Sequence, residues 1–117
     1  MRVAFSCEED AGLESKISEH FGRSPYFILV DMEGEEIKKV ESVVNPYYGF
    51  SLQPGMIPRF LKDKGVKIVT TGGIGRRAVD FFTQWGMEVF TAQGRVKEAL
   101  LLLKENKLIP ASPCKER

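Results

Sequence analysis

The sequence is poor in the residues that build metal sites and disulfide frameworks. Its 117 residues include two cysteines, Cys7 and Cys114, and a single histidine, His20. The cysteines stand far apart and form no Cys-x-x-Cys motif, which excludes a framework of several disulfides and a zinc site made of four cysteines. Because His20 is the only imidazole, any histidine chemistry in this chain has to use it.

The chain also lacks an excess of charge of one sign. Seventeen Lys and Arg stand against sixteen Asp and Glu, which leaves a formal net charge of +1. Proteins that bind nucleic acid through its phosphates concentrate basic residues on one surface. The near-neutral balance therefore argues against a nucleic-acid partner, although it leaves room for a local basic patch.

Long hydrophobic runs are absent as well. The longest uninterrupted apolar runs are Tyr26–Val30 and Ala99–Leu103, whereas a membrane helix needs about 20 apolar residues and a secretory signal an apolar core of about 7–15. Both runs have the length of core segments, so we expect a cytoplasmic protein with no membrane partner. The length and a composition of 43% hydrophobic and 28% charged residues predict one domain over residues 1–117.

What the sequence does contain is an alternation of strand-like and helix-like patterns. Short apolar and β-branched segments bounded by turn residues predict five strands, at residues 2–6, 26–32, 37–44, 66–71 and 87–90. Apolar residues at helical spacing predict three helices, over residues 56–64, 75–85 and 95–106. The order, with a hairpin in the first half and parallel crossovers in the second, predicts a three-layer α/β domain around a mixed five-stranded sheet. The polar segment 110–117 is predicted to be a frayed tail.

A glycine loop follows the segment 66–71. The stretch Gly73-Ile74-Gly75-Arg76-Arg77-Ala78 matches the pattern G-x-G-x-x-G/A at the start of a predicted helix. Glycines let a ligand approach the backbone, and the free N–H groups of a helix start favour an anion, to which Arg76 and Arg77 add positive charge. A full dinucleotide-binding unit would carry this motif after its first strand and would need a larger domain. The position of the glycine loop after the fourth predicted strand therefore argues against such a unit. A plain β–α turn with solvated arginines is the alternative.

A second candidate lies at the end of the long polar stretch 7–25. Here His20 is followed by Phe21, Gly22, Arg23 and Ser24. Gly22 leaves the backbone accessible, and Arg23 can neutralise an anionic ligand. Ligands sit at the carboxyl ends of parallel strands, so we expect the loops after 2–6 and 66–71 to share one edge and bring His20 close to the glycine loop. A solvated loop histidine is the alternative interpretation.

These segments carry a resemblance to a known family. Residues 18–27 and 72–78, together with 86–89 and 96–100, resemble the dinitrogenase iron–molybdenum cofactor-binding family, in order, from residue 2 to about 108. The resemblance implies a ribonuclease H-like fold and a carrier without catalytic activity. The cargo would be an anionic iron–molybdenum or related iron–sulfur cluster, passed between donor and acceptor proteins. It also implies His20 as a metal ligand.

One position departs from the family pattern. Nitrogenase-associated members often carry a cysteine where this chain has Ser24. The nearest thiol, Cys7, directly follows the first predicted strand, so it is a second candidate ligand for a soft metal, with a buried, inert thiol as the alternative. The candidate cofactor-binding residues are His20, Gly22, Arg23, Ser24, Gly73, Gly75, Arg76 and Arg77, and the candidate metal ligands are His20 and Cys7.

Other functions stay open from the sequence. A small anion- or nucleotide-binding regulatory module would use the loop Gly73–Ala78. An interaction domain would use the aromatic residues of segment 45–55, which are Tyr47, Tyr48 and Phe50. A ribonuclease H-type nuclease needs carboxylates on its central strands, and the segment 2–6 has none. A Cys–His hydrolase would require Cys7 and His20 to meet in space.

Overall fold

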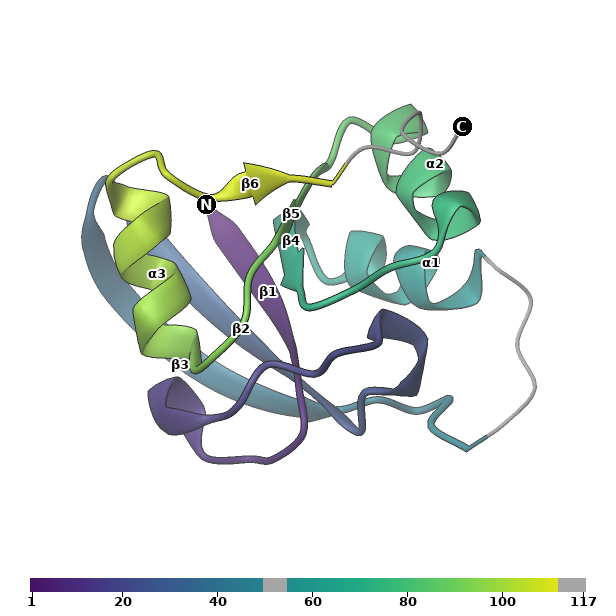
Figure 1. The fold of residues 1–117 in the computed structure, drawn as a ribbon, viewed down its shortest axis with the longest axis horizontal. Helices are drawn as coiled ribbons and strands as arrows, with labels where there is room; N and C mark the ends of the chain where they lie inside the picture. Colours follow the sequence, from purple (N-terminus) through teal and green to yellow (C-terminus); the bar gives the residue numbers. More distant parts are fainter. Residues whose placement is uncertain (50–54, 112–117) are drawn as a thin grey trace.

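A six-stranded mixed sheet forms the centre of the protein, in the order β3-β2-β1-β4-β5-β6 (Figure 1). The computed structural model describes residues 1–49 and 55–111. The strands are β1 (Arg2–Cys7), β2 (Tyr26–Glu33), β3 (Glu36–Val44), β4 (Val66–Thr71), β5 (Glu88–Thr91) and β6 (Ile109–Pro110). The three central strands β1, β4 and β5 are parallel, while β2, β3 and β6 each run antiparallel to their inner neighbour.

The predicted five-stranded sheet is wrong by one strand. In β6, Ile109 pairs with Thr91 and Pro110 with Phe90, and the N–H of Ala111 donates to the carbonyl of Val89 at 2.9 Å. The sequence predicts a frayed tail from residue 110, but residues 110 and 111 are held at the edge of the sheet by these contacts. Residues 112–117 lie outside the described residues. A proline is acceptable in this strand because it lies at the edge of the sheet.

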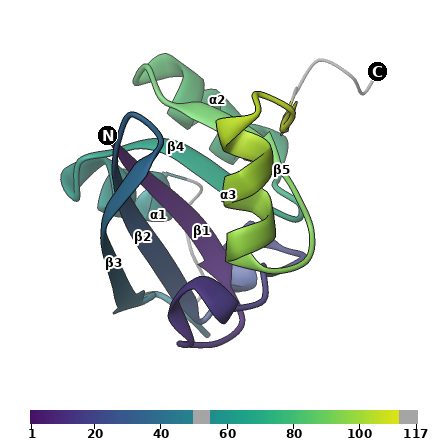
Figure 2. The same cartoon turned by 90° about the vertical axis from the view of Figure 1, so that its left-hand side faces the viewer.

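Three helices cover the two faces of the sheet and give the predicted three layers (Figures 1 and 2). Helices α1 (Met56–Asp63) and α2 (Arg76–Gln84) pack on one face, and α3 (Val96–Lys104) packs on the other beside a 3-10 turn, η1 (Gly12–Glu14). The strands supply alternate side chains to two apolar clusters: Phe5 and Val30 join the cluster under α3, whereas Ala4 and Leu29 join the cluster under α1 and α2. No helix of the described residues is long and apolar enough to cross a membrane.

Glycines end two of the helices as the sequence predicts. Gly65 follows α1 with φ 80° and Gly86 follows α2 with φ 78°. Both lie in the left-handed region, which glycine adopts without the steric cost of a Cβ. Each residue therefore turns the chain toward the next strand, β4 or β5.

The long polar stretch after β1 folds back onto the end of the sheet. It contains η1 and a second 3-10 turn, η2 (Phe21–Arg23). Isolated β-bridges join Cys7 to Ile17 and Lys16 to Arg95. The stretch is thus fixed at several points against β1 and the start of α3, and it brings η2 to the carboxyl ends of the parallel strands.

Candidate functional site

Two loops meet at the carboxyl ends of β1 and β4. The N–H of Gly72 donates to the carbonyl of Ser18 at 2.9 Å, and the N–H of Phe21 donates to the carbonyl of Gly73 at 2.8 Å. The parallel pairing of β1 with β4 places both loops at one edge of the sheet, as expected. These two hydrogen bonds hold the backbone of His20, which lies between Ser18 and Phe21, beside the glycine loop.

The glycines of this region fall into two kinds. A Cβ on Gly72 would lie 2.6 Å from the carbonyl oxygen of Ser18, and a Cβ on Gly73 would lie 2.6 Å from that of Glu19. Gly72 and Gly73 are therefore needed for the two loops to touch. By contrast, a Cβ on Gly22 or Gly75 would meet no atom within 4 Å. The backbone at these two positions is open to a ligand.

Uncharged polar side chains fill the interior beneath the loops. Among the described residues, every buried polar side chain lies at this end of the sheet: Ser6, Ser15, Ser18, Ser24, Asn45, Thr70 and Thr71. The hydroxyl of Ser6 donates to Thr71 Oγ1 at 2.6 Å, whereas Ser18 Oγ and Thr70 Oγ1 have no partner within the described part of the chain. The end of the sheet that carries the loops is thus polar inside, unlike the rest of the core.

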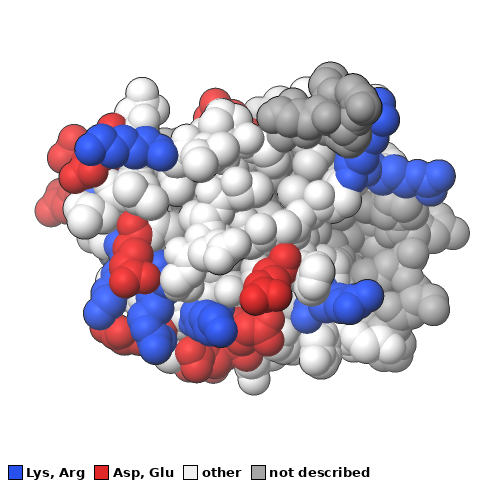
Figure 3. Space-filling model, in the orientation of Figure 1, with Lys and Arg blue, Asp and Glu red and all other residues white. Residues whose placement is uncertain are grey.

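His20 lies exposed at an open pocket of about 360 Å³. The pocket is lined by Glu8, Lys16, Ile17, Glu19, His20 and Arg23. Two carboxylates and two cations surround the imidazole, so the charges of the wall balance. Figure 3 shows the same mixture along the lower edge of this face, where the loop after β1 runs.

The sequence missed the other four lining residues, Glu8, Lys16, Ile17 and Glu19. Glu8 belongs to an acidic run, a pattern typical of a loop exposed to solvent. Its N–H donates to the carbonyl of Lys16 at 2.9 Å, and this contact exists only because the chain folds back after β1. A signal was present only for Glu19, which directly precedes His20.

The start of α2, which follows the glycine loop, carries positive charge, but none of its residues lines the pocket around His20. Gly75 precedes the helix, and no side chain caps that end. As at every helix start, the N–H groups of the first turn have no intrahelical acceptor, and they carry the positive end of the helix dipole. Arg76 and Arg77 are exposed there. The carbonyl of Gly73 accepts a hydrogen bond from the N–H of Phe21. The N-cap of α2, Gly75, therefore lies two residues along the chain from the contact between the two loops.

Ser24 lies inside the protein and not at the pocket. It is fully buried, and its hydroxyl donates to the carbonyl of Phe21 at 2.9 Å. The side-chain amide of Asn45 in turn donates to the carbonyl of Ser24 at 2.8 Å. In this structure Ser24 closes the turn η2 and thereby orients His20 and Arg23.

The structure does not bring Cys7 to the pocket around His20. Its side chain is fully buried in the apolar cluster under α3, and burial raises the pKa of the thiol to about 12. The neutral thiol is a poor metal ligand compared with a thiolate. Across residues 1–49 and 55–111, no group of three or more His, Cys, Asp and Glu side chains could hold a metal ion.

The burial of Cys7 gives a direct test. We expect its alkylation at about pH 8 to be on the order of a thousandfold slower in the native protein than in urea, since only the thiolate reacts and burial shifts the thiol far from its usual pKa of about 8.5. The measurement uses iodoacetamide and mass spectrometry on a Cys114→Ser variant, which leaves one thiol. Rapid labelling of the native variant would show that Cys7 is accessible, as a metal ligand has to be.

Comparison with known proteins places this chain in a family. The family model described as dinitrogenase iron-molybdenum cofactor matches residues 1–106. The uncharacterized protein MJ0580 of Methanocaldococcus jannaschii is 31% identical over 96 residues, which cover 80% of this chain and 81% of that protein. Residues 1–106, which the family model matches, include the His20 turn, the glycine loop and the first turn of α2.

Solved structures agree on the fold. The crystal structure of PH0822 has a TM-score of 0.83 at 45% identity, covering 95% of this chain and 96% of its own. The apo form of the orange protein from Desulfovibrio gigas has a TM-score of 0.79 at 23% identity, covering 95% and 92%, and at that identity the likeness concerns the fold alone. Because the family model spans all but the last eleven residues, the chain belongs to the dinitrogenase iron-molybdenum cofactor family.

Proposed function

We propose that this protein binds and carries an anionic metal cluster, of the iron–molybdenum or a related iron–sulfur type, without transforming it chemically. The observation that carries the proposal is the junction of two loops, in which exposed His20 is held beside the glycine loop by paired backbone hydrogen bonds. Membership of the family supports this cargo. We further propose that the fold is ribonuclease H-like, and that donor and acceptor proteins are the partners.

The donor set suits a preassembled cluster better than a bare ion. A bare zinc or iron ion in a protein takes three or four side-chain ligands, and the described residues bring no three such side chains together. A cluster carries its own sulfides and needs only one or two protein ligands. Exposed His20 supplies one imidazole nitrogen, and the open backbone at Gly22 and Gly75 gives a bulky cargo room to approach.

Charge decides on which side of His20 the cluster would lie. The pocket wall itself is balanced, with Glu8 and Glu19 against Lys16 and Arg23. The start of α2 adds free N–H groups to the cationic side. An anionic cluster is therefore favoured between His20 and the glycine loop, with Arg76 and Arg77 as counter-charges, and it is disfavoured near Glu19.

The test is anaerobic reconstitution with ferrous iron and sulfide, with and without molybdate, followed by gel filtration and metal analysis. We expect metal at about one cluster per chain in the native protein and a loss of about tenfold or more in His20→Ala, because removal of a metal ligand abolishes most affinity. Glu19→Gln is the matched control, since it changes the neighbouring exposed side chain and keeps the imidazole. We expect it to retain at least as much metal as the native protein.

The alternative, a module that binds a small anion or nucleotide through Gly73–Ala78, rests on the uncapped start of α2. The double variant Arg76→Glu with Arg77→Glu should weaken either ligand, because it reverses charge at a helix start. His20→Ala separates them: a phosphate binder should keep its affinity for inorganic phosphate. Equal metal content in the native protein and in His20→Ala would contradict the assignment of His20 as ligand.

A further inference from the structure

The outward face of α3 is apolar at its centre. The helix buries Val96, Ala99 and Leu100 against the sheet, but Leu101 is 57% exposed and Leu102 is 38% exposed. A surface helix ordinarily carries polar residues on its solvent side. Two adjacent exposed leucines in the middle of a nine-residue helix therefore indicate a contact surface.

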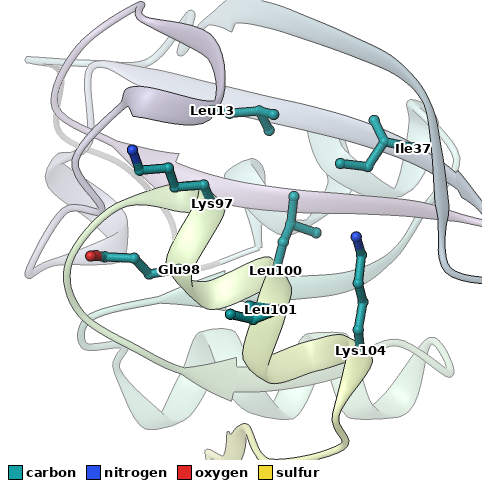
Figure 4. A pocket seen from close by; sticks show the side chains of 7 residues that line it. All are labelled: Leu13, Ile37, Lys97, Glu98, Leu100, Leu101 and Lys104. Carbon is teal, nitrogen blue, oxygen red and sulfur yellow. The ribbon is translucent and has the colours of Figure 1, made fainter.

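A hollow with apolar walls lies beside this face. It has a volume of about 360 Å³ and lies between α3, η1 and β3. Figure 4 shows Leu13 and Ile37 on one side and Leu100 of α3 pointing toward them, with the side chains of Lys97 and Lys104 at the two ends. The hollow shares no residue with the pocket around His20, so it belongs to a different surface of the protein.

The charges along α3 are self-complementary about Leu101. A Lys-Glu pair, Lys97 and Glu98, begins the helix, and a second Lys-Glu pair, Lys104 and Glu105, ends it. When two such helices lie antiparallel with Leu101 at the midpoint, Lys97 faces Glu105 of the second copy and Glu98 faces Lys104. Opposite charges then meet at every position, and both ends of the contact are equivalent.

We propose that this face is a homodimer interface, in which α3 packs antiparallel against α3 of a second copy about a two-fold axis near Leu101. Such an isologous contact uses the same patch on both chains. Leu101 and Leu102 pack against their counterparts, and the leucine ridge of each copy covers the mouth of the other's hollow. The pockets around His20 stay open in both copies.

The charges set the register of the dimer more than its strength. Lys97 already pairs with Glu14 at 2.9 Å, and Lys107 with Glu105 at 3.6 Å, while the Glu98 carboxylate accepts the N–H of Arg95 at 2.8 Å. Exposed ion pairs contribute little affinity, yet like charges in opposition disfavour the wrong register. Affinity comes from the leucines. Because α3 is only about 13 Å long, the contact is small and the association depends on concentration.

The edge strand β3 is the competing surface, and the structure argues against it. Val44 is 65% exposed there, so the strand is not devoid of apolar surface. However, Lys38 and Lys39 lie along it, and the pairing with β2 is irregular near Asp31. Edge lysines and bulges are the features that keep a sheet edge from pairing with another chain.

Sedimentation equilibrium over about 10 µM to 1 mM tests the proposal, since weak interfaces associate in this range. We expect the apparent mass of the native protein to rise from 13.2 kDa toward twice that value, and Leu101→Glu to stay monomeric throughout. Val44→Glu is the matched control, because it places the same charge on a somewhat more exposed apolar position outside the proposed face. Far-UV circular dichroism checks the fold of each variant.

A charge exchange tests the antiparallel register. Lys104→Glu alone and Glu98→Lys alone each bring like charges together and should weaken association by about tenfold. An equimolar mixture of these two variants brings opposite charges together again and should recover the native mass. The proposal is overturned if the native protein is monomeric at the highest concentration, if Val44→Glu abolishes association, or if the mixture fails to recover it.

Discussion

Gly73→Ala is expected to lower the free energy of unfolding by about 1–3 kcal/mol, the usual cost of forcing an extra carbon into a packed site. The new Cβ would lie 2.6 Å from the carbonyl oxygen of Glu19. That oxygen is backbone, so it cannot rotate away as a flexible side chain would. The two loops must move apart, and the N–H of Phe21 then loses the carbonyl of Gly73 as its acceptor.

Gly75→Ala is the matched control two residues further on. Its φ of −74° suits any residue, and a Cβ there would meet no atom within 4 Å. We expect its urea midpoint to stay close to that of the native protein, because alanine restricts the unfolded chain more than glycine does but is less favourable at the N-cap of α2. Under the reconstitution conditions, Gly73→Ala should also lose metal. Equal urea midpoints for the two variants would mean that the loops are not in tight contact.

Phe21→Ala is expected to cost still more stability, about 3–5 kcal/mol, as large-to-small changes at buried aromatic residues do. Phe21 is 4% exposed, and its ring packs against Phe27 at 5.7 Å and against Phe82 at 5.5 Å between centroids. The ring anchors η2 in the core, directly after His20. Its loss should therefore both destabilise the fold and release the turn that carries the imidazole.

Phe82→Ala separates these two effects. Phe82 is fully buried and shares the same aromatic contact, but it belongs to α2 and not to the His20 turn. We expect a similar fall in urea stability for the two variants, with metal retention lost in Phe21→Ala and largely kept in Phe82→Ala below the unfolding transition. If both variants retain metal equally, the aromatic anchor does not position His20.

Much of the fold is predictable from the sequence because its central strands are covered on both faces. Such strands, as at Tyr26–Val30, are continuous apolar runs, and glycines such as Gly65 and Gly86 mark where helices end. The sixth strand could not be found in this way. β6 has two exposed residues, one of them Pro110, and it owes its existence to pairing with β5. A tertiary contact of that kind leaves no periodic signal in the chain.

The site was predictable where it depends on topology. Parallel strands end at one edge, which is sufficient to expect His20 beside the glycine loop. The sequence does not reveal which glycines let the two loops pack together and which leave the backbone open to a ligand. A Cβ on Gly73 would meet a carbonyl oxygen, whereas a Cβ on Gly75 would meet open space. Nor does it show that Ser24 is turned inward, since that orientation depends on the carbonyl of Phe21 and the amide of Asn45.

The two hydrogen bonds between the loops have a consequence for how the protein folds and opens. Each joins residues more than fifty positions apart in the chain, whereas the β2–β3 hairpin closes over a turn at Gly34. Closing a long loop costs more chain entropy than closing a hairpin, so the hairpin is available early in folding and the loop junction forms late. We therefore expect the junction to be able to open locally while the strands stay paired. A cluster carrier would gain from this arrangement, because cargo could enter and leave while the sheet stays intact.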